Sequence, residues 1–395
     1  MEKCASQIKL NQLFEQYPEK KAEMDSFNAN YDKIDLSSFR TGAVTVNIPI
    51  VVHVLYNNST QNISDAQIQS QIDVLNQDFN NLNSDKLANT HPFYSSIGNA
   101  NITFCLATTD PNGNATSGIE RKQVSQNSFD AEAADETIIK KSVNGGIDGW
   151  DKTKYLNIWI VKFDDGTLGY GTFPDETPAI YDGLVVDYRA FGTIGQASYP
   201  YNKGRTTTHE LGHWLNLFHI WGDSFCGNDF VNDTPKQEAE NYDCPTFPIN
   251  INGCSGATGS NGEMFMNYMD YVDDACMNMF TNGQVTRMYA VLNTYRSSFI
   301  NNTSCGSVSA IHNSNLDAIK VYPNPAVNYF YIDGLSTTND LYTVRIYNEV
   351  GQLIKQQQLQ HQQEEIAIFD LINGNYIVNI SNSSNNITKK LIILH

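Results

Sequence analysis

The stretch from His209 to His219, His-Glu-Leu-Gly-His-Trp-Leu-Asn-Leu-Phe-His, constrains this chain more than any other feature. On a helix, His209 and His213 lie one turn apart on one face, so both imidazoles can reach a single metal ion at about 2 Å. His219 can add a third nitrogen only if the helix ends near Asn216 and the chain turns back. Three protein ligands leave a fourth position open, which is typical of a catalytic zinc site.

Glu210 lies next to this face without being a ligand, where it can accept a proton from an attacking water. Two simpler interpretations compete with a catalytic zinc. The histidines could be ordinary polar residues of an amphipathic helix, or they could hold a purely structural zinc. The first leaves the spacing of three histidines unexplained, and structural sites are usually closed by four ligands, often cysteines, without a glutamate beside them.

A second stretch, Asn267-Tyr-Met-Asp-Tyr271, looks like a Met-turn. With it, the chain resembles the metzincin metalloproteases and, within them, the pappalysin family. The resemblance implies that Met269 forms a hydrophobic floor under the zinc and that Tyr271 assists the oxyanion of the reaction. The chain departs from the metzincin pattern at Asn216, where the family has Gly. Asn tolerates the left-handed conformation better than other non-Gly residues do, so we expect the turn to be kept.

Composition agrees with a secreted protein of two or three domains. The chain has 395 residues, of which 41% are hydrophobic, and a formal net charge of −18. That charge argues against nucleic acid or an anionic membrane as a partner and suits a chain that binds calcium. No apolar run approaches 18 residues, so we expect no membrane span. No signal peptide follows Met1, and we therefore expect the sequence to begin after a removed leader.

The seven cysteines carry information about compartment. Cys226, Cys244, Cys254 and Cys276 cluster in a loop-rich stretch after the zinc motif, where disulfides are useful; a zinc cluster is the alternative, but no Cys-x-x-Cys pair occurs there. Four cysteines allow three pairings, and the family resemblance favours Cys226 with Cys254 and Cys244 with Cys276. Cys105 and Cys305 could form a third bridge between the end of the catalytic domain and its N-terminal sheet.

Cys4 then remains unpaired, and a thiolate is a good fourth ligand for zinc. Pappalysin zymogens resemble this arrangement, since a cysteine of their pro-segment occupies the open zinc position. The alternatives are a stray thiol or a lipid-modified cysteine. The switch reading predicts a pro-segment over residues 1–40, with a helical stretch near Ile8 to Phe27 and a cleavable connection around Arg40.

The next segment reads as the start of an α+β catalytic domain over residues 41–303. A β-rich run from Val44 to Leu55 precedes an N-cap at Ser64 and an amphipathic helix whose apolar stripe is Ile68, Ile72, Leu75, Phe79 and Leu82. His53, within the run, is expected to be a packed core residue. Further strands are predicted at 102–107, 155–161 and 183–188. The resemblance implies a mixed twisted sheet plus the active-site helix, with 183–188 as the antiparallel edge strand that binds substrate.

Two further site predictions depend on the resemblance. Closely spaced oxygen ligands after Cys226 suit calcium, and the family has a calcium site in this loop, which makes Asp229, Asp233 and the carbonyls of Val231 and Thr234 the candidates. An ordinary acidic turn is the alternative. Asp274 matches a family acid at the base of the pocket just after the scissile bond, which accepts Arg or Lys. Asp273 or Asp274 could instead cap a turn.

The last part changes in composition. Residues 304–316, rich in Ser and Asn, read as a linker, and residues 317–395 alternate short β-rich runs with turns, which predicts a small all-β sandwich. The runs are 329–332, 342–347, 352–357, 365–369, 376–380 and 389–394. Val321-Tyr-Pro-Asn-Pro325 and Leu371-Ile-Asn-Gly-Asn-Tyr376 resemble the C-terminal sorting domain of type IX secretion cargo in Gram-negative bacteria. A carbohydrate-binding or adhesive module with exposed Tyr322 and Tyr329 is the alternative.

Taken together, the sequence predicts the proenzyme of a zinc-dependent endopeptidase, secreted or held at the cell surface, with protein or peptide substrates and the type IX machinery as partners. Zinc is the expected cofactor and calcium a structural one. A surface adhesin that binds protein without cutting it is the alternative from another class. Glu210 argues against it, because a binding module needs no general base there. A peptidase of another specificity, unlatched and already active, is the nearer alternative.

Overall fold

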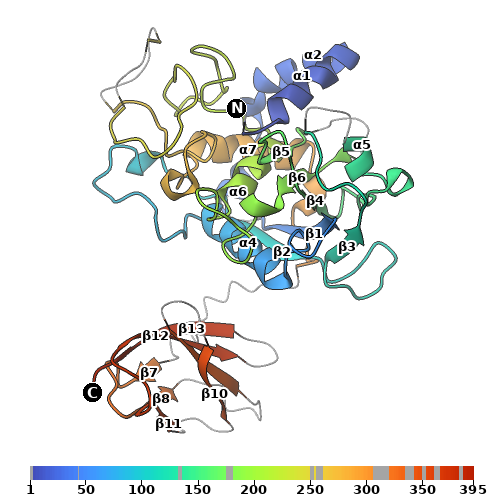
Figure 1. Ribbon diagram of the computed structural model, residues 1–395. Coiled ribbons are helices and arrows are strands. Elements are labelled where there is room, and N and C mark those ends of the chain that lie inside the picture. The colour runs from blue at the N-terminus through green and yellow to red at the C-terminus, as the bar shows by residue number, and fades with distance from the viewer. Residues whose placement is uncertain are drawn as a thin grey trace. The chain divides into compact units, whose positions relative to one another are not determined.

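The computed structural model describes residues 3–42, 44–131, 136–174, 181–249, 253–254, 261–305, 320–333, 342–348, 353–359, 365–381 and 386–395 (Figure 1). The chain divides into two compact units, Met1–Gly306 and Ser307–His395. The helices of the first unit are α1 (Ser6–Gln16), α2 (Pro18–Asn28), α3 (Ser37–Arg40), α4 (Asp65–Asp78), α5 (Glu136–Ile139), α6 (Arg205–Trp214) and α7 (Asn282–Thr294). Its strands are β1 (Val46–Tyr56), β2 (Ile102–Leu106), β3 (Ile119–Gln123), β4 (Leu156–Val161), β5 (Gly169–Gly171) and β6 (Leu184–Asp187).

The sheet of the first unit is mixed, with the order β2-β1-β4-β6-β5 and β3 pairing with β1. All pairs are parallel except β5 with β6. Strand β1 is central, with residues such as Ile50 and Val52 fully buried, because helices and loops cover both faces of the sheet. The predicted run from Val44 therefore is a central strand.

One expectation about the sheet was wrong. Strand β6, within the predicted 183–188 run, is parallel to β4 and lies inside the sheet. The antiparallel edge is β5, Gly169–Gly171, whose Gly-Tyr-Gly sequence has little strand propensity. Its glycines are required by packing, since a Cβ on Gly171 would lie 2.3 Å from the backbone oxygen of Glu210 in α6.

Two helix predictions need correction. The N-terminal helical stretch is two helices, because Pro18 begins α2 at its first turn and Tyr17 before it is non-helical. The apolar stripe of α4 does not extend to Leu82, which is 68% exposed, because the helix ends at Asp78 and Asn81 turns the chain with φ 51°. Ser64 caps α4 as predicted, accepting a hydrogen bond from the Gln67 backbone N–H.

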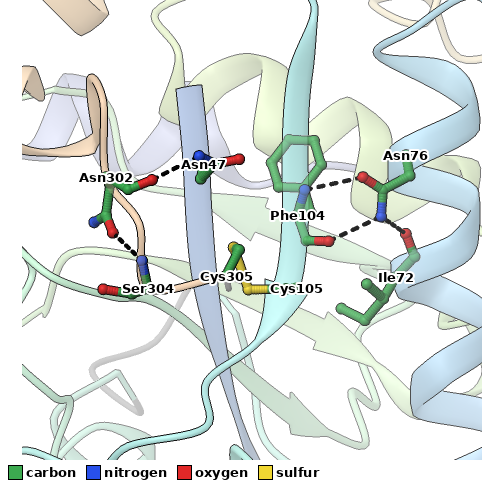
Figure 2. Close-up of a disulfide and its surroundings, with 8 residues drawn as sticks. All are labelled: Asn47, Ile72, Asn76, Phe104, Cys105, Asn302, Ser304 and Cys305. Carbon is green, nitrogen blue, oxygen red and sulfur yellow. Dashed lines mark hydrogen bonds between the residues drawn. A yellow bond between two sulfur atoms is a disulfide. The ribbon is translucent and has the colours of Figure 1, made fainter. Parts of the chain in front are cut away.

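The end of the first unit is tied back to the start of its sheet (Figure 2). Cys305 forms a disulfide with Cys105 of β2, and the side chain of Asn47 in β1 donates a hydrogen bond to the Asn302 carbonyl at 2.6 Å. Backbone pairing of Val46 with Ile300 continues this connection. The two ends of residues 44–305 thus lie side by side, and the third disulfide that the sequence suggested is formed.

The second unit is all antiparallel β in its described residues. A sheet of order β10-β9-β12-β13 and a sheet of order β11-β8-β7 enclose an apolar core that includes Phe330, Val378 and Ile393. The strands are β7 (Lys320–Tyr322), β8 (Tyr329–Asp333), β9 (Tyr342–Tyr347), β10 (Leu353–Leu359), β11 (Ile366–Ala367), β12 (Gly374–Ser381) and β13 (Asn386–Ile393). Each predicted run overlaps a strand, as expected for a small sandwich. Only Ile366–Ala367 of the 365–369 run is paired, Gln352 lies outside the described residues, and β7 was not predicted. Most of the predicted linker lies outside the described residues.

None of the described helices is long and apolar enough to cross a membrane.

Candidate active site

The helix that carries the histidine motif ends where the sequence required it to end. Helix α6 stops at Trp214, and Asn216 adopts the left-handed conformation with φ 66°. The backbone N–H of Asn216 donates to the His213 carbonyl and that of Leu217 to the Gly212 carbonyl, which is a Schellman ending. This turn reverses the chain and brings His219 back to the two histidines of the helix.

The three imidazoles converge through their Nε2 atoms. Every pair among His209, His213 and His219 has its Nε2 atoms 3.2 Å apart. Each Nδ1 faces an acceptor: the Tyr268 carbonyl at 2.7 Å, the Leu217 carbonyl at 2.8 Å and the Asp223 carboxylate, in that order. Each Nδ1 therefore carries the proton, and each Nε2 directs a lone pair at the others.

Three lone pairs this close repel one another unless a cation lies between them. Nitrogens 3.2 Å apart match the corners of a tetrahedron about 2.0 Å from a metal ion. Burial, and then His219, lower the pKa of His209 to about 3. Burial, and then the other two histidines, lower the pKa of His213 well below its usual value, so both rings are neutral and can act as ligands. The donor set fits a metal ion.

A fourth donor comes from the N-terminal segment, which we define as residues 3–40. The Cys4 Sγ lies with the three histidines in one group whose ligand atoms are all within 4.8 Å of one another. Cys4 is the free cysteine of the described residues and is buried. Burial and the nearby Glu210 raise the pKa of its thiol, whereas a metal ion in the group would favour the thiolate.

Glu210 is also held by the N-terminal segment. Its Oε2 accepts hydrogen bonds from the Ser6 Oγ at 2.9 Å and the Cys4 Sγ at 3.2 Å. Burial raises the pKa of this carboxyl to about 7, the range in which a carboxylate can take up and release a proton near neutral pH. The Ser6 Oγ also accepts a hydrogen bond from the Gly171 N–H of the edge strand at 2.9 Å.

The segment enters the site as an added strand. The Ala5 N–H donates to the Gly169 carbonyl at 3.1 Å and the Leu168 N–H to the Lys3 carbonyl at 2.8 Å, so Cys4 pairs with Gly169 in parallel. Pairing of an extended peptide with a free strand edge is a recurring mode of peptide binding. Strand β5, Lys3 and Ser6 were not singled out from the sequence. For β5, the two glycines of 169–171 were a local sign of close packing against another element; Lys3 and Ser6 had no such sign.

Met269 and Tyr271 both lie close to the histidine group. Met269 is fully buried under α6, and its Sδ would be 2.4 Å from a Cβ on Gly212. The Tyr271 ring lies 4.9 Å from that of His219, and its hydroxyl donates to the Cys4 carbonyl at 3.4 Å. The tyrosine therefore points at a backbone carbonyl of the chain that occupies the site.

Asp274 borders the same cavity of about 20 Å³ as His209, Glu210 and Lys3. Its Oδ2 accepts hydrogen bonds from the backbone N–H groups of Lys203 and Arg205, so it also anchors the start of α6. Burial raises its pKa to about 6. Asp274 thus caps α6 and lines the cavity, whereas Asp273 makes no side-chain cap of the short helix that follows it.

Lys3 occupies the acidic end of this cavity. Its Nζ donates to the Tyr271 carbonyl at 2.8 Å and lies 4.7 and 5.0 Å from the ring centroids of Tyr201 and Tyr242. Burial lowers the pKa of Lys3, while nearby carboxylates favour its charged form: Asp243, Asp270, Asp273 and Asp274.

The calcium candidates lie together in the loop after α6. Asp229 is buried, and its carboxylate accepts hydrogen bonds from the Thr234 hydroxyl at 2.7 Å and the Val231 N–H at 3.1 Å. The Asp233 carboxylate accepts from the Thr281 hydroxyl and the Gly283 N–H. All four candidate residues border a cavity of about 420 Å³. The carboxylates of Asp229 and Asp233 and the carbonyl of Val231 already accept hydrogen bonds within the protein.

The remaining predicted residues are placed as follows. The disulfides Cys226–Cys254 and Cys244–Cys276 are formed, the pairing that the resemblance implied. His53 is fully buried in β1, with its ring nitrogens 2.7 Å from the Glu120 carboxylate and 2.9 Å from the Asn157 amide oxygen. It is a satisfied core residue, as expected.

Comparison with known proteins yields two family matches. Residues 140–293 match the peptidase family described as pregnancy-associated plasma protein-A, and residues 320–394 match the secretion system C-terminal sorting domain. An extracellular metalloprotease of Verticillium alfalfae is 33% identical over 252 residues, which are 61% of this chain and 75% of the relative. One from Arthroderma benhamiae is 31% identical over 275 residues, covering 67% and 79%.

Two solved structures from Tannerella forsythia resemble the first unit. Mature mirolysin in complex with a cleaved peptide is 49% identical, with a TM-score of 0.62, and the match covers 66% of this chain and 97% of that one. A promirolysin point mutant is 44% identical, with a TM-score of 0.68, over 75% of this chain and 96% of that one. The match to promirolysin thus covers more of this chain than the match to the mature enzyme.

Proposed function

Because this chain belongs to the pappalysin family of secreted metalloproteases and carries a C-terminal sorting domain, we propose that it is the latent precursor of a zinc endopeptidase. One observation carries the proposal: the Cys4 thiol of the N-terminal segment lies in one ligand group with His209, His213 and His219. Zinc binds both neutral imidazole nitrogens and thiolate sulfurs and is usually four-coordinate, so this group fits it.

A zinc ion held by the three histidines would polarise the scissile carbonyl and make a water more acidic. Glu210 takes the proton from the attacking water at its carboxylate and passes it to the leaving amine as the C–N bond breaks. Its raised pKa, about 7, suits both transfers. Tyr271 donates its hydroxyl to the oxygen of the carbonyl under attack, the role supported by its contact with the Cys4 carbonyl. Met269 supports the histidine helix from below.

In the precursor, residues 1–40 act as a pro-segment. With zinc bound by the histidines, the Cys4 thiolate would be a further ligand and would keep substrate and water from the metal. Ser6 and Cys4 hold the Glu210 carboxylate, and residues 3–5 cover the edge of β5 that a substrate needs. Cleavage near the exposed Arg40, between α3 and β1, releases the catalytic domain, residues 41–303.

Asp274 selects a basic residue just after the scissile bond. The cavity that it borders adjoins His209 and Glu210, and Lys3 lies there among four carboxylates and two tyrosine rings. An Arg or Lys of a substrate would take the place of Lys3.

Calcium is proposed as a structural ion at Asp229, Asp233 and the carbonyls of Val231 and Thr234. Their shared cavity supports this, and each carboxylate oxygen that accepts one hydrogen bond keeps a further lone pair for the ion. Calcium should raise the melting temperature of the native chain, and the rise should vanish in Asp229→Ala and persist in Asp151→Ala, an exposed acid elsewhere. An equal rise in melting temperature in both variants would show that calcium does not bind at this site.

Residues 317–395 carry the sorting signal. We propose export by the type IX machinery of a Gram-negative bacterium, followed by removal of this domain in the 304–316 linker. The sandwich fold and the family match support this role. The mature enzyme would then act outside the cell or at its surface.

The proposal is tested with the full chain. Zinc content and cleavage of a denatured protein should be measured before and after limited trypsin treatment, with Cys4→Ala and Glu210→Ala in parallel. We expect one zinc per chain, activity after trypsin treatment, activity without trypsin in Cys4→Ala and none in Glu210→Ala. Stoichiometric zinc with no cleavage under any condition would instead support a binding module. Equal activity before and after trypsin would show an unlatched peptidase.

A further inference from the structure

A series of aromatic rings leads away from the histidine group, and none of them borders the Asp274 cavity. The rings of Phe173, Phe218 and Phe230, which we call the aromatic row, follow one another at centroid distances of 5.1 and 5.4 Å. The row begins at the site itself, because the Phe173 ring lies 5.3 Å from that of His213. Phe173 follows the edge strand β5, so the row is continuous with the strand that binds the N-terminal segment.

The N-terminal segment supplies the cover of this row. Leu10 of α1 is fully buried against Phe173 and Phe218, and three further side chains of the segment pack there: Leu13, Phe14 and Met24. Beyond them, the Arg287 guanidinium lies 5.6 and 4.9 Å from the ring centroids of Phe27 and Tyr31, also of the segment. Helices α1 and α2 pack side by side, with α1 against β5 (Figure 1). The same guanidinium lies 5.3 and 5.7 Å from the ring centroids of Phe218 and Phe230, so removal of the segment would uncover the aromatic row with Arg287 beside it.

The N-terminal segment does not fill all of the space against the catalytic domain. A cavity of about 20 Å³ remains between Leu10, Phe14 and Met24 on one side and Asn216 and Tyr295 on the other. Asn216 is fully buried, and neither its amide nitrogen nor its amide oxygen has a hydrogen-bond partner. A polar amide beside an apolar wall is suited to a peptide, which presents both a side chain and backbone groups.

The direction of the chain decides which part of a substrate would reach the row. The N-terminal segment runs from Lys3 in the acidic cavity, past Cys4 at the histidines, to Leu10 on the aromatic row. If the acidic cavity takes the residue after the scissile bond, as proposed above, the residues before the bond extend from the metal toward Phe173. A substrate thus runs opposite to the segment, antiparallel to β5.

The distance between Cys4 and Leu10 indicates which residue of a substrate would reach the aromatic row. Leu10 is six residues after Cys4, almost all of them in α1, so the two are about 9 Å apart along the helix. An extended peptide covers that length in about three residues. We propose that the aromatic row is a second specificity site, which binds an apolar or aromatic side chain two to four residues before the scissile bond. This inference rests on the proposed function.

The test uses the activated enzyme and two peptides. Both have Arg after the scissile bond, and they differ at the third residue before it, which is Phe in one and Ser in the other. We expect kcat/KM to be about tenfold higher for the Phe peptide, the lower end of what an apolar pocket provides, because the row is open on one side. Phe230→Ser should bring the ratio close to one. Val143→Ser, a change at a side chain that is 83% exposed, should leave it unchanged.

A wild-type measurement keeps the test decisive if Phe230→Ser does not fold. A peptide library varied at each of the six positions before the bond should show the apolar preference only at positions two to four. Equal cleavage of all library members would overturn the inference. A preference for acidic residues would also overturn it, because the substrate would then be bound by the Arg287 guanidinium and not by the aromatic rings. Absence of cleavage of every peptide would instead count against the proposed function.

Discussion

At the scale of single residues, the proposed roles of Asp274 in selectivity and of Asn216 in the geometry of the site can both be measured. Asp274 has a pKa raised to about 6 by burial, so it is a carboxylate above that pH and neutral below it. Only the carboxylate attracts a basic side chain. In the activated enzyme, the ratio of kcat/KM for Arg over Gln after the scissile bond should therefore fall by roughly tenfold between pH 7.5 and pH 5.

Asp274→Asn should give the low ratio at both pH values, whereas Asp151→Asn should follow the wild type. A ratio that stays constant with pH in the wild type would mean that Asp274 does not select the basic residue.

Asn216 holds the turn that makes the histidine group. Its φ of 66° is strained for any residue with a Cβ, and its buried amide has no partner. Asn216→Gly should raise the free energy of unfolding by about 1 kcal/mol, and Asn216→Val should lower it by about 2 kcal/mol, because a β-branched residue tolerates this conformation least. Urea denaturation of the precursor measures both. A gain in stability for the Val variant would contradict the argument.

At the scale of elements, the position of β5 against α6 decides whether a substrate is held in register. A Cβ on Gly171 would lie 2.3 Å from the Glu210 carbonyl oxygen, so the strand would have to move away. Gly171→Ala should lower kcat/KM of the activated enzyme by roughly a hundredfold, since a shift of about 1 Å in a bound substrate can cost that much. Zinc content should remain unchanged, because the strand provides no ligand.

Gly253→Ala is the matched control, since this glycine is exposed and its Cβ would lie 3.5 Å from the nearest atoms, an ordinary contact distance. Loss of zinc in Gly171→Ala would show that the strand supports the metal ligands and not only the substrate.

At the scale of the whole molecule, the Cys105–Cys305 disulfide closes the first unit before the chain continues to the second (Figure 2). It restrains a loop of 200 residues in sequence separation. Replacing both cysteines by Ser should lower the free energy of unfolding of the first unit by about 2–5 kcal/mol. Latency should be unchanged, because no contact of Cys4 involves this region. If the precursor without this disulfide were active before trypsin treatment, the disulfide would contribute to latency, contrary to this prediction.

Agreement between sequence and structure was best where the signal was local. The N-cap at Ser64, the end of the histidine helix and the strands of the second unit depend on neighbouring residues, and each was predicted near its observed position. The antiparallel edge was assigned to the wrong strand, because Gly169-Tyr-Gly171 has no propensity of its own and is extended only by pairing with β6. Leu82 was assigned to a buried stripe because the pattern does not reveal where α4 ends.

The sequence by itself determined which atoms can bind a metal and which carboxylate stands beside them, because His209, Glu210 and His213 are positioned by the geometry of one helix. The resemblance of the surrounding motifs extended this to the family. The resemblance also implied that Cys4 occupies the open metal position, whereas tertiary structure alone placed Lys3 and Ser6 beside it. Lys3, Cys4 and Ser6 lie more than 200 residues from Glu210 in sequence, and their contacts follow from strand pairing and packing between distant segments. No local pattern encodes such contacts, so the acidic cavity around Lys3 and the aromatic row under Leu10 became visible only in the fold.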